Sequence, residues 1–236
     1  TSEMEAFFEV CPCTVIGVTG SDGKSTTSTV ISRMLENAGY RTWLGGNIGM
    51  PLLDKVPEME PDDYVVVELS SFQLMTMRKS PHISVITNVT PNHLDVHKDM
   101  DEYIEAKQRI FSFRTDGGRT VLNWDNQVTR NYALSAKGAI FFFSSRQTHE
   151  EICEAAGQLG ITDFGRVSTV TLRNGVITVN KGVKHGPERV VDISDIKIPG
   201  MHNVENYMAA IAAVEGIVPC STVVETARTF EGVEHR

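Results

Sequence analysis

The stretch TVIGVTGSDGKSTTSTVISRMLENAG, residues 14–39, decides the fold of this chain. Its first six residues are mainly apolar and β-branched, which is typical of a buried strand. From Lys24 onward the apolar residues recur at helical spacing, and Gly39 stands where such a helix would end. A loop between a strand and a helix is a favourable place for an anion, because free backbone N–H groups and the helix dipole converge there.

The loop has the residue types of a phosphate-binding loop but not the usual spelling. The common pattern requires a glycine five residues before the Gly-Lys pair, and Val18 occupies that place. The glycines would still let the backbone approach a phosphate, with a lysine for the terminal phosphates and a serine hydroxyl for Mg²⁺. The alternative is a plain turn followed by a helix-capping serine. The candidate ATP-binding residues of this loop are Gly20, Ser21, Asp22, Gly23, Lys24, Ser25 and Thr26.

Strands alternate with helices along most of the chain, which predicts an α/β fold. This alternation is typical of a mostly parallel sheet covered by helices on both faces. After Gly165 the pattern becomes that of a small antiparallel sheet near residues 167–198, attached to the main sheet, with a hairpin at Arg173-Asn174-Gly175. An alanine-rich helix then begins near residue 201. The expected strands are 14–19, 41–44, 64–69, 83–88, 120–123, 139–143, 167–172, 176–180 and 190–198, and the expected helices 24–38, 99–113, 126–136 and 150–159.

Composition excludes several classes of partner. The 236 residues are 41% hydrophobic and 22% charged, which suits one large globular domain or two small ones. A net charge of −8 argues against nucleic acid as a partner. No apolar run has the length of a membrane span and no secretion leader is seen, so we expect a cytoplasmic protein. We also expect it to be a monomer. The four cysteines lack the spacing of a zinc site and are expected to be free thiols.

Two side chains follow predicted strands at the edge where ligands of open α/β sheets bind. Glu68 follows the three valines of YVVVEL, residues 64–69, and a carboxylate there is costly to bury without a partner. We interpret it as a Mg²⁺ ligand beside Ser25, the alternative being a side chain that turns outward. His93, in the loop NVTPNHLD, is a candidate for a metal or the substrate, although a loop histidine is more often plain surface.

Lys107, in YIEAKQRIF at residues 103–111, is not nominated by its pattern. It lies on a predicted helix whose other face is apolar. Such a position is typical of a surface lysine whose stem packs along the helix while the amine reaches water. Composition and spacing therefore predict an ordinary surface residue here.

Taken together, these stretches resemble the Mur ligases, which build the peptide of bacterial peptidoglycan with ATP. Their phosphate loop is similar to GVTGSDGKSTT, residues 17–27, but usually has Thr and Asn where Ser21 and Asp22 stand. The stretch ELSSFQL favours the D-glutamate-adding members over their relatives. The other matching motifs, in the family's order, are GGNIGMPL at 45–52, TNVTPNHLD at 87–95, YIEAKQRIF at 103–111 and GMHNVENYMAA at 200–210.

The resemblance implies a role for each matched residue. Lys24 would contact the β- and γ-phosphates, and it would form the catalytic set together with His93 and Lys107. Ser25 and Glu68 would hold one Mg²⁺, and His93 and Lys107 a second, with Lys107 carbamylated on its amine. A carbamate is an oxygen ligand of the kind a hard metal prefers, and it forms from a neutral amine, which burial promotes. The remaining implied contacts are Asn203 and Asn206 to adenine, Arg236 to the sugar, and Asn47, Ser70, Ser71 and Gln73 to the muramyl-peptide side.

The resemblance also implies a domain and a reaction. Residues 1–236 would be the central ATP-binding domain, without the N-terminal UDP-binding and C-terminal ligase domains of the family. ATP would activate the carboxylate of UDP-N-acetylmuramoyl-L-alanine as an acyl phosphate, and D-glutamate would attack it to form an amide. On its own, this domain is expected to show weak or undetectable ligase activity. The alternatives are another Mur ligase, a ligase of the folylpolyglutamate synthase type, or a nucleotide-binding module without ligase activity.

Overall fold

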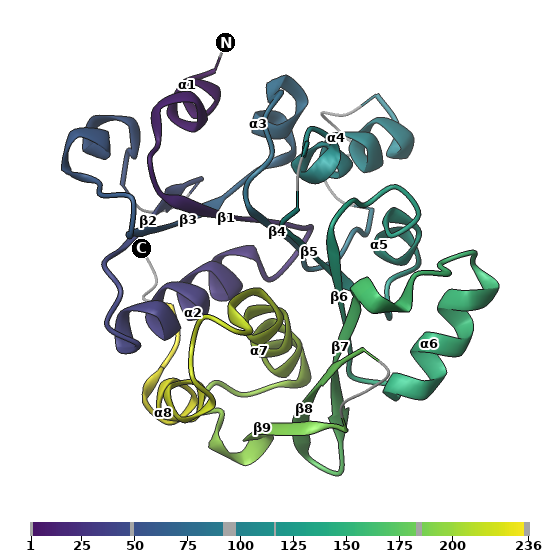
Figure 1. The fold of residues 1–236 in the computed structure, drawn as a ribbon. Helices are drawn as coiled ribbons and strands as arrows, with labels where there is room; N and C mark the ends of the chain where they lie inside the picture. Colours follow the sequence, from purple (N-terminus) through teal and green to yellow (C-terminus); the bar gives the residue numbers. More distant parts are fainter. Residues whose placement is uncertain (1, 48–49, 92–97, 116, 183–185, 234–236) are drawn as a thin grey trace.

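The strand before the predicted phosphate loop lies inside a parallel sheet, with a neighbour on each side. The computed structural model describes residues 2–47, 50–91, 98–115, 117–182 and 186–233. Within them one sheet of nine strands has the order β2-β3-β1-β4-β5-β6-β7-β8-β9 and runs through the whole molecule (Figure 1). The strands are β1 (Thr14–Thr19), β2 (Thr42–Gly46), β3 (Tyr64–Glu68), β4 (Ile83–Ile86), β5 (Arg119–Asn123), β6 (Ala139–Ser144), β7 (Val167–Arg173), β8 (Val176–Lys181) and β9 (Glu188–Asp192).

The order of the strands creates a switch point at β1. The chain goes from β1 outward to β2, returns to β3, and then crosses to β4 on the other side of β1. Within this register Val18 of β1 lies between Glu68 of β3 and Val85 of β4. In open α/β sheets ligands bind outside the carboxyl ends of the strands at such a point. The loop after β1 therefore lies between the segments that follow β3 and β4.

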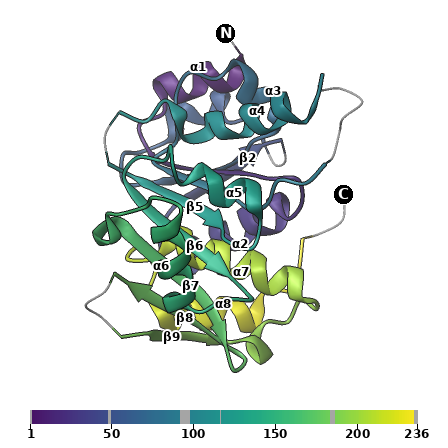
Figure 2. The same ribbon diagram turned by 90° about the vertical axis from the view of Figure 1, so that its right-hand side faces the viewer.

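Helices cover both faces of the sheet (Figures 1 and 2). The β3 sequence YVVVE contributes side chains to both faces of the sheet, because alternate side chains of a strand point to opposite faces. Val66 belongs to one hydrophobic cluster, and Val65 and Val67 belong to the other. One cluster includes residues of α2 (Lys24–Asn37), α7 (Met201–Val214) and α8 (Cys220–Thr229). The other includes residues of α1 (Glu3–Val10), α3 (Ser71–Thr76), α4 (Met100–Ser112), α5 (Gln127–Tyr132) and α6 (His149–Gln158).

The predicted α/β class, the mostly parallel sheet and the small antiparallel part attached to it are confirmed. β7 pairs with β6 in parallel, and β8 and β9 then continue the same sheet in antiparallel fashion. The hairpin between β7 and β8 turns at Asn174 and Gly175, both with positive φ, as the sequence indicates. The strand expected at 190–198 is wrong in its bounds: β9 is Glu188–Asp192, and the chain then forms the short 3₁₀ helix Ile193–Asp195.

Three helices, α1, α3 and α8, were not predicted. All are short, and α3 has only six residues, so hydrophobic periodicity gives little signal. α3 is instead recognisable by its start, where Ser70 and Gln73 form a capping box. Within the part of the chain that the structure describes, none of the helices combines the length and apolar character that crossing a bilayer requires.

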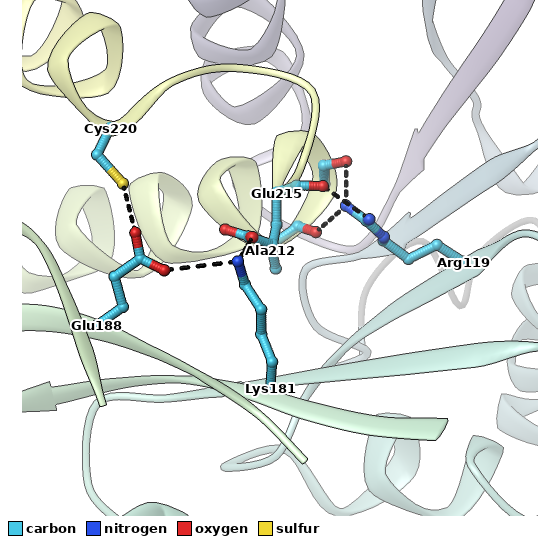
Figure 3. A network of polar contacts seen from close by, with 7 residues as sticks. Arg119, Lys181, Glu188, Ala212, Glu215 and Cys220 are labelled. Carbon is cyan, nitrogen blue, oxygen red and sulfur yellow. Dashed lines mark hydrogen bonds and ion pairs between the residues drawn. The ribbon is translucent and has the colours of Figure 1, made fainter. Parts of the chain in front are cut away.

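Arg119 at the start of β5 ties down the far end of α7 (Figure 3). Its guanidinium donates to the carbonyl oxygens of Ala212, Ala213 and Glu215 at 2.8–2.9 Å. These carbonyls lack partners within the helix, and a cation there also complements the helix dipole. The Glu215 carboxylate is paired with Lys181 of β8. α7 is thereby fixed to β5 and β8, and its amino end is directed toward the loop after β1.

Candidate functional site

The loop Gly20–Gly23 is shaped by its contacts with the segment after β4. The backbone N–H groups of Ser21 and Asp22 both donate to Asn88 Oδ1, at 3.1 and 2.9 Å. Thr87 Oγ1 donates to the Asp22 carbonyl at 2.6 Å. A side chain at Gly20 would collide with that same Thr87 hydroxyl, so the loop needs glycine for close approach.

Gly23 is required for a second reason. Its φ of 81° lies in the left-handed region, and a Cβ there would overlap Asn206 Oδ1 of α7. The loop therefore turns sharply into α2 and is packed directly against α7.

Lys24, the first residue of α2, folds its side chain back over the loop. Its Nζ donates to the carbonyl oxygens of Gly20 and Ser21, at 3.1 and 3.0 Å. The ammonium is partly exposed and is held at the anion-binding end of α2. A phosphate placed on the loop would therefore meet this ammonium together with the N–H groups at the start of α2.

Glu68 closes β3 with its carboxylate turned inward. It is 2% exposed; its Oε2 accepts a hydrogen bond from Ser25 Oγ at 2.7 Å, and Oε1 accepts from Asn47 Nδ2 at 3.1 Å. The expectation that Glu68 lies beside Ser25 is confirmed, and the alternative of an outward side chain is wrong. A hydroxyl and a carboxylate in direct contact are donor types that Mg²⁺ takes.

The surface position that pattern alone predicts for Lys107 is wrong. Lys107 is 2% exposed, and its Nζ donates to the Gly20 carbonyl at 2.9 Å. The amine also lies 4.5 Å from the centre of the Tyr103 ring. Burial, reinforced by the nearby Lys24 ammonium and opposed by Asp22, lowers the pKa of the Lys107 amine to about 7. α4 thus brings a readily deprotonated amine under the phosphate-loop segment.

The sequence held a signal for this position that the pattern analysis missed. The buried residues of α4 are Tyr103, Ala106, Lys107, Ile110 and Phe111. Their spacing is that of a single helical stripe, and Lys107 lies within it, not on the opposite polar face. A lysine inside an apolar stripe is the feature that marks it as buried.

A pocket opens beside the loop and continues along the ends of the strands. Asp22 and Gly23 line it at the loop, and Asn206 lines it from α7. The rest of the lining comes from separate elements, so no single stretch of sequence marks it: Thr87, Asn88, Asn123, Phe143, His202 and Glu205. A partly polar pocket next to an anion-binding loop can accept the remainder of a nucleotide.

The comparison with known proteins agrees with this geometry. Residues 18–214 match the model of the Mur ligase middle domain. The chain belongs to the Mur ligase middle-domain family. A UDP-N-acetylmuramoylalanine--D-glutamate ligase from Acetivibrio thermocellus is 48% identical over all 236 residues, and one from Clostridium kluyveri is 45% identical over the same length. The chain spans 47% and 46% of these two relatives, about half the length of each.

Solved structures of Mur ligases share the fold at lower identity. A UDP-N-acetylmuramoyl-L-alanyl-D-glutamate--2,6-diaminopimelate ligase is 21% identical and has a TM-score of 0.69, with 99% of this chain and 49% of that chain covered. MurF from Acinetobacter baumannii is 20% identical with a TM-score of 0.65, covering 96% of this chain and 48% of that one. These likenesses establish the fold of the middle domain.

The Mur ligase middle domain brings only some of the expected site residues together. Lys24, Ser25, Glu68, Asn47 and Lys107 surround the loop. Asn206 lines the pocket, and its Nδ2 donates a hydrogen bond to Asn203 Oδ1 at 3.3 Å. Asn203 Nδ2 in turn donates to the Pro199 carbonyl. Thr26 follows Ser25 on the first turn of α2 and is partly exposed. His93 and Arg236 lie outside the described residues.

Three of the four residues expected on the substrate side, Ser70, Ser71 and Gln73, lie at the start of α3. Ser70 Oγ accepts from the Gln73 N–H at 3.3 Å, and Gln73 Oε1 accepts from the Ser70 N–H at 2.9 Å. Ser71 is buried at 5% exposure. Ser70 and Gln73 are partly exposed, so each keeps a face that a substrate could reach.

Proposed function

We propose that this chain is the ATP-binding part of a ligase that joins D-glutamate to UDP-N-acetylmuramoyl-L-alanine for peptidoglycan synthesis. The observation that carries the proposal is the cluster of Lys24, Ser25 and Glu68 around a glycine loop that opens into a pocket. The relatives that match the whole chain are named as ligases of this kind. The proposal places the protein in the bacterial cytoplasm as a monomer, without nucleic-acid or membrane partners.

The donor set around the loop fits Mg²⁺. Ser25 Oγ and Glu68 Oε2 are in direct contact, and both are hard oxygen ligands. They would hold one Mg²⁺ between the phosphates and β3. A second Mg²⁺ would use His93 and Lys107, the latter as its carbamate. The lowered pKa of Lys107 supports carbamylation, because the reaction with CO₂ requires the neutral amine. Bound Mg²⁺ would supply charge neutralisation for the transferring phosphoryl group.

The chemistry that we propose has two steps. An oxygen of the substrate carboxylate attacks the γ-phosphorus of ATP, the bond to the β-phosphate oxygen breaks, and ADP leaves. The D-glutamate amine then attacks the acyl carbon, loses a proton, and inorganic phosphate departs with the electron pair of the C–O bond. The carboxylate and the γ-phosphate are both anionic, so the first step needs cations. Lys24 provides one that is already held over the loop.

Calorimetric titration with Mg²⁺ and a non-hydrolysable ATP analogue tests the nucleotide site. The wild-type chain should bind, and Lys24→Ala should lose detectable binding because the cation that faces the terminal phosphates is gone. Lys137→Ala is the matched control, since this exposed lysine precedes β6 and so lies at the amino ends of the strands, opposite the loop. Equal affinity of wild type and Lys24→Ala would remove the loop from the site.

The ligase reaction needs a separate test in the full-length protein. Phosphate release should require ATP, UDP-N-acetylmuramoyl-L-alanine and D-glutamate together, and the product should carry one new amide. Omission of either acceptor or donor should stop the amide from forming. Replacement of D-glutamate by another amino acid with equal turnover would contradict the proposed specificity.

A further inference from the structure

Two of the four cysteines lie in the segment that joins α1 to β1, at the end of β1 opposite the phosphate loop (Figure 1). Cys11 caps the carboxyl end of α1 and Cys13 directly precedes β1, with Pro12 between them. β1 has six residues, each rising about 3.3 Å, so the pair lies roughly 20 Å from the loop. A function of these cysteines would therefore be separate from the proposed nucleotide site and would go beyond it.

The side chains of Cys11 and Cys13 are close enough to interact directly. A hydrogen bond joins the two thiols, and the Cys13 backbone N–H also donates to the Cys11 sulfur. A disulfide requires Cα atoms roughly 4.4–6.8 Å apart. Residues two apart in the chain reach about 7 Å only when fully extended, and the ring of Pro12 holds φ near about −65°, short of full extension. The two sulfurs can therefore bond to each other with only a local adjustment of the backbone.

The two thiols differ in their access to solvent. Cys13 is 2% exposed, and its Sγ donates to the Glu60 carbonyl at 3.2 Å. Cys11 is only partly buried. A small oxidant can therefore reach Cys11 but not Cys13, whereas Cys13 is already in contact with Cys11. An accessible thiol backed by a second thiol is the arrangement in which the first reacts with the oxidant and the second resolves the product into a disulfide.

We propose that Cys11 and Cys13 form a reversible disulfide by exchange with a small-molecule disulfide of the glutathione type. The Cys11 thiolate attacks one sulfur of the small disulfide, whose S–S bond breaks, and one small thiolate leaves and takes up a proton. Cys13 then loses its proton, and its sulfur attacks Cys11 Sγ, so that the second small thiol leaves. The two protein sulfurs together give up two electrons, and one small disulfide is reduced to two thiols. In a reducing compartment such a bridge forms transiently and responds to the redox state.

The rate of the exchange depends on the fraction of Cys11 that is thiolate. Burial raises the pKa of Cys11, and the hydrogen bonds from Cys13 partly oppose this increase. The pKa of Cys13 is raised to about 12 by burial, with Cys11 and the Asp63 carboxylate adding to the increase and the Arg41 guanidinium opposing it. Both thiols are therefore mostly protonated at pH 7. The rate of bridge formation should rise about tenfold from pH 7 to pH 8, because the thiolate fraction rises by that factor.

Mass spectrometry of the full chain after incubation with oxidised glutathione at pH 8 tests this proposal. The chain has no lysine or arginine before Lys24, so trypsin releases both cysteines in one peptide, residues 1–24, with no other cysteine. In the wild-type chain this peptide should lose two hydrogen atoms, and dithiothreitol should restore them. Cys13→Ala should instead retain one glutathione on Cys11, because the resolving thiol is absent. Cys220→Ala, which removes a partly buried thiol from α8, is the matched control and should still form the bridge.

Several outcomes would overturn the inference. A wild-type peptide that stays reduced, or that carries glutathione without closing, would show that the two sulfurs do not bond to each other. A bridge from Cys11 or Cys13 to Cys153 or Cys220 would overturn the pairing, and a rate that does not change with pH would overturn attack by the thiolate. If Cys13→Ala does not fold, the wild-type peptide still decides, because the bridge is located in it directly. The nucleotide titration is a separate measurement, so either proposal can fail without the other.

Discussion

Gly23 and Gly39 stand at opposite ends of α2, and they allow a direct measurement of how tightly the loop is packed against α7. Both have positive φ, 81° and 91°. An alanine at Gly39 would have no described atom within 4 Å of its Cβ, whereas an alanine at Gly23 would overlap Asn206 Oδ1 well inside 3.0 Å. The two substitutions therefore share the backbone cost and differ in the collision.

The structure sets the expected magnitudes. A left-handed alanine costs about 1 kcal/mol, which is the whole effect expected for Gly39→Ala. In Gly23→Ala, Asn206 must also move, and it then loses its contacts with Thr27 and Asn203, both at 3.3 Å. Two such hydrogen bonds contribute about 1–2 kcal/mol together. We expect Gly23→Ala to lower the free energy of unfolding by about 2–3 kcal/mol in total.

Urea unfolding followed by circular dichroism provides the assay, with each glycine variant measured in wild-type and Asn206→Ala backgrounds. Removing the Asn206 side chain removes the collision, so Gly23→Ala should cost only about 1 kcal/mol in that background. Gly39→Ala should cost the same in both backgrounds. Additivity of Gly23→Ala with Asn206→Ala would refute the claim that the loop is held against α7 through this contact.

Three further predictions concern buried or partly buried ionisable groups. The pKa of the Lys107 amine is lowered to about 7 in the folded chain. Between pH 7 and 10.5 the unfolded chain therefore holds a proton that the folded chain has lost, so the free energy of unfolding should rise with pH. In urea titrations at different pH values, Lys107→Met should flatten this rise. Arg119→Met removes three hydrogen bonds to the carbonyl oxygens at the end of α7, a loss of about 3 kcal/mol. Calorimetry should therefore show Tm lowered by roughly 6–12 °C. An unchanged Tm would contradict the anchoring role of Arg119. Cys13 is buried and its pKa is raised to about 12 by burial, so iodoacetamide at pH 8 should alkylate it last of the four cysteines by mass spectrometry, and early labelling would show that the segment before β1 opens.

Local pattern was sufficient for the elements that carry the site. β1, the loop and α2 lie within a residue of their predicted bounds, because hydrophobic periodicity and glycine placement are properties of neighbouring residues. Glu68 was also found in advance, since a carboxylate that ends a run of valines needs a partner. Elements shorter than two or three turns, such as α3, gave no periodic signal.

Lys107 shows where pattern analysis fails. Its helix is amphipathic, and the usual preference of lysine for water outweighed its place in the apolar stripe. What decides its burial is the position of α4 over the Gly20 carbonyl, 87 residues earlier in the chain. That contact exists only once the sheet has assembled.

The sequence by itself determined the strand, loop and helix that bind an anion, the α/β class, and the family to which the chain is similar. Only the tertiary structure decided which distant side chains meet there. Ser25 reaches Glu68 across 43 residues, Thr27 reaches Asn206 across 179, and Glu205 is anchored to Ser145 across 60. The physical reason is that secondary structure follows from short-range periodicity, whereas the order of strands in the sheet follows from burying both of its faces at once.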